Sequence, residues 1–258
     1  MITLVSANDI KNAIERFAPA ELAEDFDNVG LLVGSGKKEV KKILLALDAD
    51  ETVVDEAIGK GADMIVTHHP VIFNAPKSIT DETAMGRTLL RLIENSIPVF
   101  SAHTNMDKAN GGLNDLMVKK LGLEVEEEHF DINNCIRICR ADTTLSRLAE
   151  KLKEEYHLPF VRFTGDPERK IKRVGLCTGG GRSMAKDASD AGCDCYISGD
   201  LHYSDIRDLV FSGTDFIEIG HYYSERCVTE IFENIIKQAY PAISTIISEE
   251  MDVFLNTF

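Results

Sequence analysis

The segment Asp63-Met-Ile-Val-Thr-His-His-Pro70 decides how this chain is organised. Its three apolar residues, Met64 to Val66, are strand formers and predict a short buried strand. His68 and His69 stand where that strand ends, and Pro70 ends the pairing because it has no amide hydrogen to donate. Two adjacent imidazoles at a strand end point in different directions, so the pair could serve two metal ions, or one ion and a substrate. A pair of half-exposed surface histidines is the alternative interpretation.

Strands and helices are expected to alternate on both sides of this segment. Apolar periodicity and turn residues predict helices at residues 6–17, 48–58, 83–95, 112–121 and 144–156, and strands before Gly34 and at 41–47, 97–102, 135–140, 160–163 and 172–176. A charged run at Glu124–Glu128 and an expected turn at Asp131-Ile-Asn-Asn134 interrupt the pattern, and we place a domain boundary near residue 126. This alternation favours an α/β fold.

The stretch around the histidine pair recurs later in the chain. Val40-Lys-Lys-Ile43 matches Ile171-Lys-Arg-Val174, and Gly61-Ala-Asp-Met-Ile-Val-Thr67 matches Gly192-Cys-Asp-Cys-Tyr-Ile-Ser198, with the same offset in both comparisons. Where the first copy has His68 and His69, the second has Gly199 and Asp200, with His202 just after. Chance similarity of two generic strand–helix–strand units is the alternative, but we favour an internal duplication.

In both copies a further strand is expected next. A histidine follows that strand, and an acidic residue lies four positions after the histidine. These motifs are His103-x-x-x-Asp107 and His221-x-x-x-Glu225. A histidine and an acid four positions apart lie on one helical face and can bind one metal. Two related halves are expected to bring their strand ends to one cleft, because ligands of such sheets bind beyond the carboxyl ends of strands.

The candidate metal ligands are therefore His68, His69, Asp107, His221 and Glu225. His103 is a candidate outer ligand or a group that orients a ligand. Imidazole and carboxylate without thiolate suit Zn, Fe, Mn, Co or Ni without selecting among them. Five such donors exceed what one tetrahedral ion needs, which favours two divalent ions roughly 3.5–4 Å apart, each with an open position for water. The alternatives are a solvated helical pair at residues 221 and 225, and a carboxylate favoured by the helix dipole at residue 107.

The turn Gly179-Gly-Gly-Arg182-Ser183 lies between an expected strand and helix. Amides at such a position can hold an anion, and Arg182 could assist. The turn lacks the lysine of a P-loop and the spacing of a dinucleotide-binding loop, so a plain tight turn is the favoured interpretation. The sequence contains no nucleophile elbow and no catalytic-triad spacing.

Composition excludes several classes of protein. The 258 residues carry 43 acidic and 28 basic side chains, a formal net charge of −15 that repels nucleic-acid phosphates. No apolar run is long enough to cross a bilayer, and the N-terminal sequence lacks the form of a signal peptide, so a cytoplasmic location is expected. The six cysteines form no Cys-x-x-Cys pair, and we expect reduced thiols in the core, Cys193-x-Cys195 included.

Together these motifs resemble the Nif-three-like family, whose members are named GTP cyclohydrolase 1 type 2 homologues or dinuclear metal-centre hexameric proteins. The resemblance covers nearly the whole chain, and its motifs are Asp27-Asn-Val-Gly-Leu-Leu-Val-Gly34, Thr67-His-His-Pro70, His103-x-x-x-Asp107, Gly165-Asp-Pro167 and Gly220-His-Tyr-Tyr-Ser-Glu225. The chain departs from the family pattern at Phe26, where many members have Trp, and at Tyr222, where some have a second His. It also lacks the inserted domain of longer relatives.

The resemblance implies two interlinked, internally duplicated three-layer α/β domains with mixed sheets. The first domain is expected at residues 1–125, with a helix and strand at 224–258 packing back onto it, and the second at 126–223. It also implies the same five ligands, two divalent metal ions, and a toroidal homohexamer with metal sites facing its interior.

The expected function is a dinuclear-metal-dependent hydrolase of a small molecule, with a nucleotide such as GTP as the candidate substrate. The alternative is a non-enzymatic metal-binding or regulatory assembly. A third hypothesis is sensing of a phosphate ligand through residues 179–183.

Overall fold

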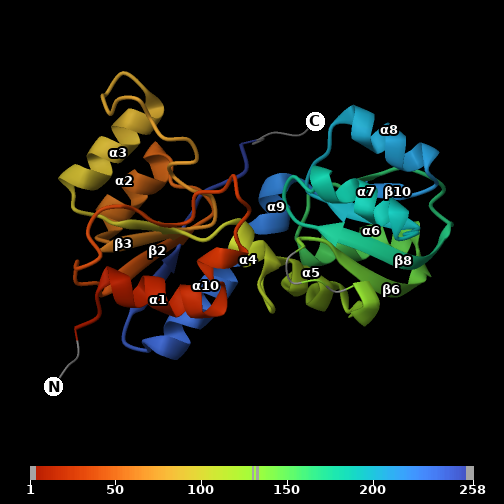
Figure 1. Ribbon diagram of the computed structural model, residues 1–258, viewed down its shortest axis with the longest axis horizontal. Coiled ribbons are helices and arrows are strands. Elements are labelled where there is room, and N and C mark those ends of the chain that lie inside the picture. Colours follow the sequence, from red (N-terminus) through yellow and green to blue (C-terminus); the bar gives the residue numbers. More distant parts are fainter. Residues whose placement is uncertain (1–3, 130, 132–133, 254–258) are drawn as a thin grey trace. The chain divides into compact units, whose positions relative to one another are not determined.

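The computed structural model describes residues 4–129, 131 and 134–253 (Figure 1). Contacts divide these residues into two compact units. The first holds the described residues up to Ala109 and those from Val228 onward, and the second runs from Asn110 to Cys227. The chain thus leaves the first unit, builds the second and returns to complete the first. Each unit contains one mixed sheet, which confirms the predicted α/β class.

The sheet of the first unit has the strand order β1-β4-β3-β2-β11. The bounds are β1 (Gly30–Val33), β2 (Lys42–Ala46), β3 (Met64–Thr67), β4 (Val99–Ser101) and β11 (Ser244–Ile247). All neighbours pair in parallel except β1, which is antiparallel to β4. The carboxyl ends of β2, β3 and β4 therefore lie at one edge of the sheet, and His68 and His69 follow β3 at that edge.

Helices cover both faces of this sheet (Figure 1). The helices are α1 (Ala7–Phe17), η1 (Ala20–Leu22), α2 (Glu51–Lys60), α3 (Ala84–Glu94), α4 (Thr104–Lys108) and α10 (Val228–Ala239). Leu44 and Ile65 of the sheet pack with Val53 of α2 and Leu89 of α3 in one buried cluster. Because neighbouring strand residues face opposite sides, the equally buried Ile43 belongs to the other face, where α1 and α10 pack together.

The sheet of the second unit has the order β5-β6-β8-β9-β10-β7. Its strands are β5 (Glu124–Val125), β6 (Arg137–Thr144), β7 (Arg162–Phe163), β8 (Lys170–Cys177), β9 (Cys195–Ser198) and β10 (Asp215–Glu218). β8, β9 and β10 are parallel, and the outer strands are antiparallel. Its helices are α5 (Leu113–Leu121), η2 (Glu127–His129), α6 (Leu145–Glu155), α7 (Arg182–Asp190), α8 (Tyr203–Phe211) and α9 (His221–Glu225).

The two copies inferred from the sequence have equivalent secondary-structure elements and an equivalent hydrogen bond. The unit β2–α2–β3 corresponds to β8–α7–β9, and β3, which precedes the histidine pair, corresponds residue for residue to β9. Asp63 Oδ2 accepts a hydrogen bond from the Lys41 amide at 2.8 Å, and Asp194 Oδ2 accepts one from the Lys172 amide at 2.7 Å. In both copies, an aspartate just before the second strand thus accepts a hydrogen bond from a backbone amide at the start of the first strand.

The compact units divide at different positions from the boundary that composition indicates. The contacts place the division after Ala109 and before Val228, whereas the sequence placed it near residues 126 and 224. β5 pairs with β6, which groups residues 124–125 with the second sheet. α10 packs beside α1 and β11 pairs with β2 in the first unit. Part of the turn expected at 131–134, and the last residues of the segment 224–258, lie outside the described residues.

All six cysteines are buried, and the described part of the chain contains no disulfide bond. Burial raises the pKa of Cys139 and of Cys193 to about 12, so these thiols stay protonated at neutral pH. The expectation of core thiols therefore agrees with the structure. Among the described residues, no helix combines the length and the apolar character needed to cross a membrane.

Candidate metal centre

The histidine pair is fixed at the carboxyl end of β3. The amide of His69 donates to the Leu47 carbonyl at 2.9 Å, which extends the pairing with β2 by one step beyond the strand. Thr67 Oγ1 donates to the His69 carbonyl at 2.8 Å. The side chain of His68 is fully buried, and that of His69 is partly buried. The backbone that carries both rings is therefore held from two sides.

A third histidine joins the pair from the end of the neighbouring strand β4. His103 is the residue before α4, and its ring centroid lies 5.1 Å from that of His68 and 5.5 Å from that of His69. One candidate ligand atom from each of the three residues lies within 4.8 Å of the others. We call these three residues the histidine cluster.

Each ring of the histidine cluster is oriented through its Nδ1 atom. His68 Nδ1 lies 2.9 Å from the Ala102 carbonyl oxygen, which can only accept a hydrogen bond. His69 Nδ1 lies 2.9 Å from Asp48 Oδ1, and His103 Nδ1 lies 2.9 Å from Asp27 Oδ1. A hydrogen on Nδ1 puts the lone pair of a neutral imidazole on Nε2. Oriented imidazoles of this kind are the usual state of metal-binding histidines.

A buried carboxylate stands next to the histidine cluster. Asp107, in the short helix α4, is 7% exposed. Its Oδ1 lies 3.5 Å from Nε2 of His68. Burying a carboxylate is costly unless positive charge compensates it. The first unit thus combines three imidazoles and one carboxylate.

Asp27 ties this arrangement to the loop before β1. Its carboxylate accepts from His103 and also from the amide and hydroxyl of Thr104, at 3.0 and 2.5 Å. Burial alone would raise the pKa of Asp27, but the hydrogen bonds from His103 and Thr104 outweigh it and hold that pKa well below the ordinary carboxyl value. Asp27 therefore remains an anion that keeps His103 in place.

The second unit contributes a donor pair on α9. His221 Nε2 lies 3.0 Å from Glu225 Oε2, and His221 Nδ1 lies 3.3 Å from Asp200 Oδ2. Burial alone would lower the pKa of His221, but the hydrogen bonds to Asp200 and Glu225 outweigh it and raise that pKa to about 10. Glu225 is 3% exposed. A proton here compensates two carboxylates, which is the role that a cation would take.

The glycine-rich turn before α7 lies against this donor pair. Gly179 has a φ of +63°, and a Cβ built on it would lie 1.9 Å from Glu225 Oε1. A side chain at this position would therefore meet the carboxylate and would also strain the backbone. Arg182 pairs with Asp205 at 2.8 Å. The glycine serves close packing on Glu225, in agreement with the interpretation as a tight turn.

The donor sets fit a divalent cation by their chemistry. Both consist of imidazole nitrogen and carboxylate oxygen, and the thiols of Cys139 and Cys193 are held protonated by burial. Such sets bind first-row divalent ions. The buried His, Asp and Glu side chains could therefore hold a metal ion.

Comparison with known proteins decides the family. A sequence profile described as Duf34/NIF3 (NGG1p interacting factor 3) matches residues 5–252. This chain belongs to that family. The match confirms the resemblance drawn from the Thr67–Pro70 and Gly220–Glu225 motifs.

Individual relatives of this NIF3-family chain are similar over nearly their whole length. A protein of Clostridium perfringens named GTP cyclohydrolase 1 type 2 homolog is 37% identical over 94% of this chain and 96% of the relative. A protein of Clostridium acetobutylicum with the same name is 36% identical over 86% of this chain and 85% of the relative. The crystal structure of a hypothetical protein of Staphylococcus aureus superimposes with a TM-score of 0.88 at 26% identity, covering 99% of this chain and all of the other.

The ligands predicted from the sequence come from both units of this NIF3-family chain. His68 and Asp107 lie together in the first unit beside His69, and His221 and Glu225 lie together in the second. Their assignment as ligands stays a prediction. His103, predicted as an outer ligand or an orienting group, lies within the histidine cluster. His202 precedes α8 without capping it through its side chain.

Sequence reasoning missed the three aspartates that orient the rings. Asp27 and Asp48 hold His103 and His69, and Asp200 holds His221. Asp200 carried a signal, because the duplication aligns it with His69. Asp27 carried one as well, because it begins a motif of the NIF3 family. Asp48 had only its place at the start of the helix expected at 48–58, directly after a strand.

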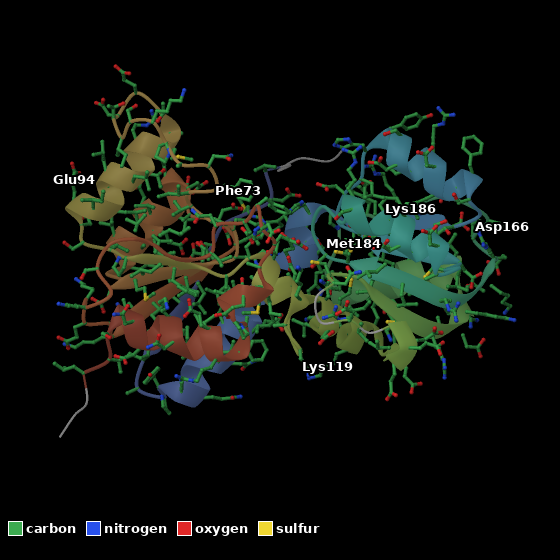
Figure 2. All side chains as sticks on the ribbon, in the orientation of Figure 1. Phe73, Glu94, Lys119, Asp166, Met184 and Lys186 are labelled. Atoms are coloured by element: carbon green, nitrogen blue, oxygen red, sulfur yellow. The ribbon has the colours of Figure 1, made fainter. Side chains whose placement is uncertain are left out.

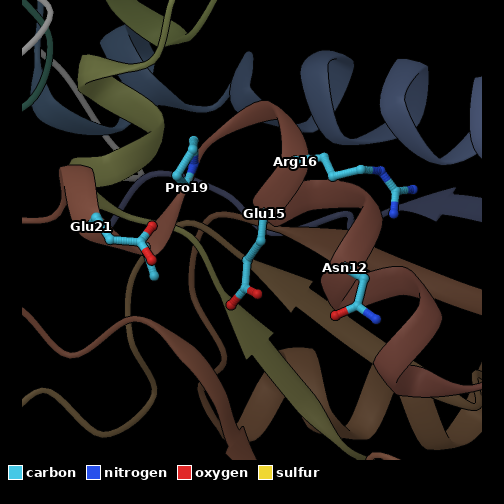
Figure 3. Close-up of a pocket in the computed structure, with 6 residues that line it drawn as sticks. Asn12, Glu15, Arg16, Pro19 and Glu21 are labelled. Carbon is cyan, nitrogen blue, oxygen red and sulfur yellow. The ribbon is translucent and has the colours of Figure 1, made fainter.

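A hollow of about 410 Å³ lies elsewhere on the first unit (Figure 3). Side chains from α1 and the segment after it line the hollow: Asn12, Glu15, Arg16, Pro19, Ala20 and Glu21. It contains no histidine and no member of either donor group. It therefore has no part in the candidate metal centre.

Proposed function

We propose that this NIF3-family protein is a metal-dependent hydrolase of a small molecule. Two divalent ions, of Zn, Fe, Mn, Co or Ni, would be held by His68, His69, Asp107, His221 and Glu225. The observation that carries the proposal is the orientation of the histidine cluster. Three adjacent rings are each held through Nδ1, which leaves the lone pair of the neutral ring on Nε2, and Nε2 of His68 lies 3.5 Å from the buried carboxylate of Asp107.

The side chains of this chain have separable tasks in the proposed reaction. A bound divalent ion lowers the pKa of water and stabilises developing negative charge. Asp107 and Glu225 supply buried negative charge that balances the ions. Asp27, Asp48 and Asp200 keep the imidazoles at fixed angles. Burial of His68 and Asp107 limits access of bulk solvent, which strengthens their electrostatic interactions.

A nucleotide is the candidate substrate because of how the relatives are named. The two clostridial proteins are called homologs of a GTP cyclohydrolase, and we propose GTP as the first compound to test here. A fold or a family name does not by itself define a chemistry. The net charge of −15 supports a small substrate that a metal ion can attract, in preference to a nucleic acid.

A metal-binding or regulatory assembly without catalysis is the alternative. It would share the donor set but would have protein ligands at every coordination position. The homohexamer implied by the family resemblance is compatible with both functions, and sedimentation of the metal-loaded protein would measure it.

The test combines elemental analysis with turnover. The protein is loaded with each of the five metals, and we expect two ions per chain, with hydrolysis of GTP or of a phosphoester. His68→Ala and Glu225→Ala should lower the metal content and abolish turnover. His157→Asn is a matched control, because His157 is an exposed histidine with a φ of +51°, a conformation that asparagine tolerates.

The outcomes separate the two functions. Loss of both metal and turnover in the variants, with His157→Asn unchanged, would support the hydrolase. Tight metal retention without turnover of GTP, phosphoesters or a broad metabolite mixture would favour the non-enzymatic assembly.

A further inference from the structure

Two exposed aromatic side chains stand beside the histidine cluster. Phe26 is 67% exposed, and Phe73 is 43% exposed. Their ring centroids lie 6.4 Å apart with the planes tilted by 52°. The ring of Phe73 lies 6.3 Å from that of His103, with its plane nearly perpendicular. We call Phe26 and Phe73 the aromatic pair, and Figure 2 labels Phe73 on the loop that follows β3.

The backbone under Phe26 is held firmly although its ring is exposed. Two residues away, the amide of Glu24 donates to Thr104 Oγ1 at 2.9 Å. Asp27, which directly follows Phe26, accepts hydrogen bonds from Thr104 and from His103. The position of the ring is thus linked to the same groups that orient His103.

The backbone under Phe73 is held as well. Val71 and Ile72, which precede it, pack against the buried cluster of the first unit. The side chain of Asn28 donates to the Ile72 carbonyl at 2.5 Å and so joins the two loops that carry the aromatic pair. Two anchored loops therefore present their aromatic rings outward, and neither ring contributes to the core.

Single exposed apolar residues are common on protein surfaces and need no explanation. Here two exposed phenylalanines lie on anchored loops, and the ring of one of them, Phe73, contacts the ring of His103. This arrangement is more specific than a single exposed apolar residue. Aromatic faces bind other planar rings by offset or tilted stacking at centroid distances of 4.5–7 Å. A ring stacked on Phe73 would lie next to His103 and hence next to the candidate metal centre.

The geometry points to Phe26 and Phe73 as the residues that select a substrate carrying a planar, conjugated ring. This inference rests on the proposed function, since it assigns the chemical class of ligand for the same site. The aromatic pair recognises the ring, and the part of the substrate that is hydrolysed faces the histidine cluster. Compounds without a ring would lack this contact.

The chain offers a direct spectroscopic test because it contains no tryptophan. Phe26→Trp would introduce a single indole into the aromatic pair. With the full-length Zn²⁺-loaded variant, GTP should quench the indole fluorescence saturably, and inorganic triphosphate, which has the charge but no ring, should not. Phe211→Trp is the control for non-specific quenching, because Phe211 is 77% exposed on α8 of the second unit.

A second variant tests whether the ring of Phe73 is needed. Phe73→Leu keeps an apolar side chain and removes the aromatic face. Combined with Phe26→Trp, it should weaken GTP binding about tenfold without changing the Zn²⁺ content. Stacking on one aromatic side chain contributes about 1–3 kcal/mol in other base-binding proteins, and tenfold corresponds to about 1.4 kcal/mol.

The results also distinguish this inference from the proposed function. Equal responses to GTP and triphosphate, an equal response at Phe211→Trp, or unchanged GTP binding in Phe73→Leu would overturn the role of the aromatic pair. A protein that hydrolyses triphosphate as readily as GTP would keep the proposed hydrolase and lose the ring preference. Quenching by GTP without turnover would keep the ring contact and remove the hydrolase.

Discussion

At the scale of single residues, His221 carries the clearest electrostatic signature. Asp200 and Glu225 each accept a hydrogen bond from its ring, which overcomes burial and raises its pKa to about 10 from an ordinary value of 6.5. A raised folded-state pKa adds stability that is complete below the unfolded-state pKa and is lost as the pH rises through the folded-state value. His221 should therefore stabilise the metal-free protein most below about pH 6.5, and this contribution should fade towards pH 10.

Urea unfolding of the metal-free protein at several pH values would measure this effect. The difference in stability between the wild-type protein and His221→Asn should shrink as the pH rises from 6.5 to 10. A difference that stays constant over this range would show that His221 is not protonated between the two carboxylates.

Gly179 provides a second prediction at this scale. Gly179→Ala places a methyl group against the carboxylate of Glu225 and imposes a left-handed backbone on alanine, which costs about 1–2 kcal/mol. We expect metal affinity to fall about ten- to a hundredfold, the effect of disturbing a group that supports a ligand. Titration with Zn²⁺ against a competing chelator would measure it.

Gly59→Ala is the matched control. Gly59 lies in α2 and shows no left-handed φ, and a Cβ built on it would have no atom within 4 Å apart from its own helix and chain neighbours. Alanine is favoured over glycine in helices by about 1 kcal/mol, so this variant should be slightly more stable with unchanged metal affinity. Equal loss of affinity in both variants would mean that contact with Glu225 is not the cause.

The sequence indicated the imidazoles and carboxylates of the candidate centre because their residue types and spacing carry the chemistry. It did not reveal what Asp48 or Asp200 would do. Their task depends on where a loop places a side chain about 3 Å from an imidazole nitrogen, and no spacing along the chain encodes that distance. Residue types and their spacing can thus be interpreted from the sequence, whereas hydrogen bonds between residues far apart in the chain cannot.

At the scale of elements, the duplicated aspartates make a paired prediction. Asp63 and Asp194 each accept two backbone amides at the start of the neighbouring strand. Asp63→Ala and Asp194→Ala should each lower the free energy of unfolding by about 1–3 kcal/mol, because the amides lose their partners. Asp190→Ala, which breaks only an exposed ion pair with Lys186, should have a much smaller effect in the same denaturant titration. Similar losses in all three variants would show that the bonded amides are not the cause, and clearly different losses in Asp63→Ala and Asp194→Ala would contradict the equivalence.

The elements themselves were largely predictable, but their exact equivalence was not. Periodicity located the strand before the histidine pair and its copy, because both are short, apolar and fully buried. The matched endings His103-x-x-x-Asp107 and His221-x-x-x-Glu225 are displaced by one residue in three dimensions. Thr67 pairs with Ser101 and Ser198 with Glu218, so His103 precedes its helix whereas His221 begins one. Sequence spacing alone could not distinguish a residue before a helix from its first residue.

At the scale of the whole molecule, the returning C-terminal segment holds the loop that carries Asp48. The carboxylate of Glu250 accepts from the amide of Leu47, and from that of Asp48 at 3.2 Å. Asp48 in turn orients His69. Glu250→Ala should free this loop and weaken Zn²⁺ binding, because the amides of Leu47 and Asp48 would lose their acceptor.

Glu249→Ala is a suitable control, since Glu249 pairs with Lys60 at the surface. Chelator competition with both variants would compare them. Unchanged affinity in Glu250→Ala, or an equal loss in Glu249→Ala, would show that the C-terminal segment has no specific influence on His69.

The pairing of β11 with β2 has a consequence for synthesis on the ribosome. β2 is complete early in translation, yet its neighbour is made only after the whole second unit has emerged. During that interval one side of an apolar strand presents unpaired amides and carbonyls, the arrangement that promotes association between nascent chains. A cell that makes this protein quickly should therefore depend on chaperones that shield the open strand until the last residues leave the exit tunnel.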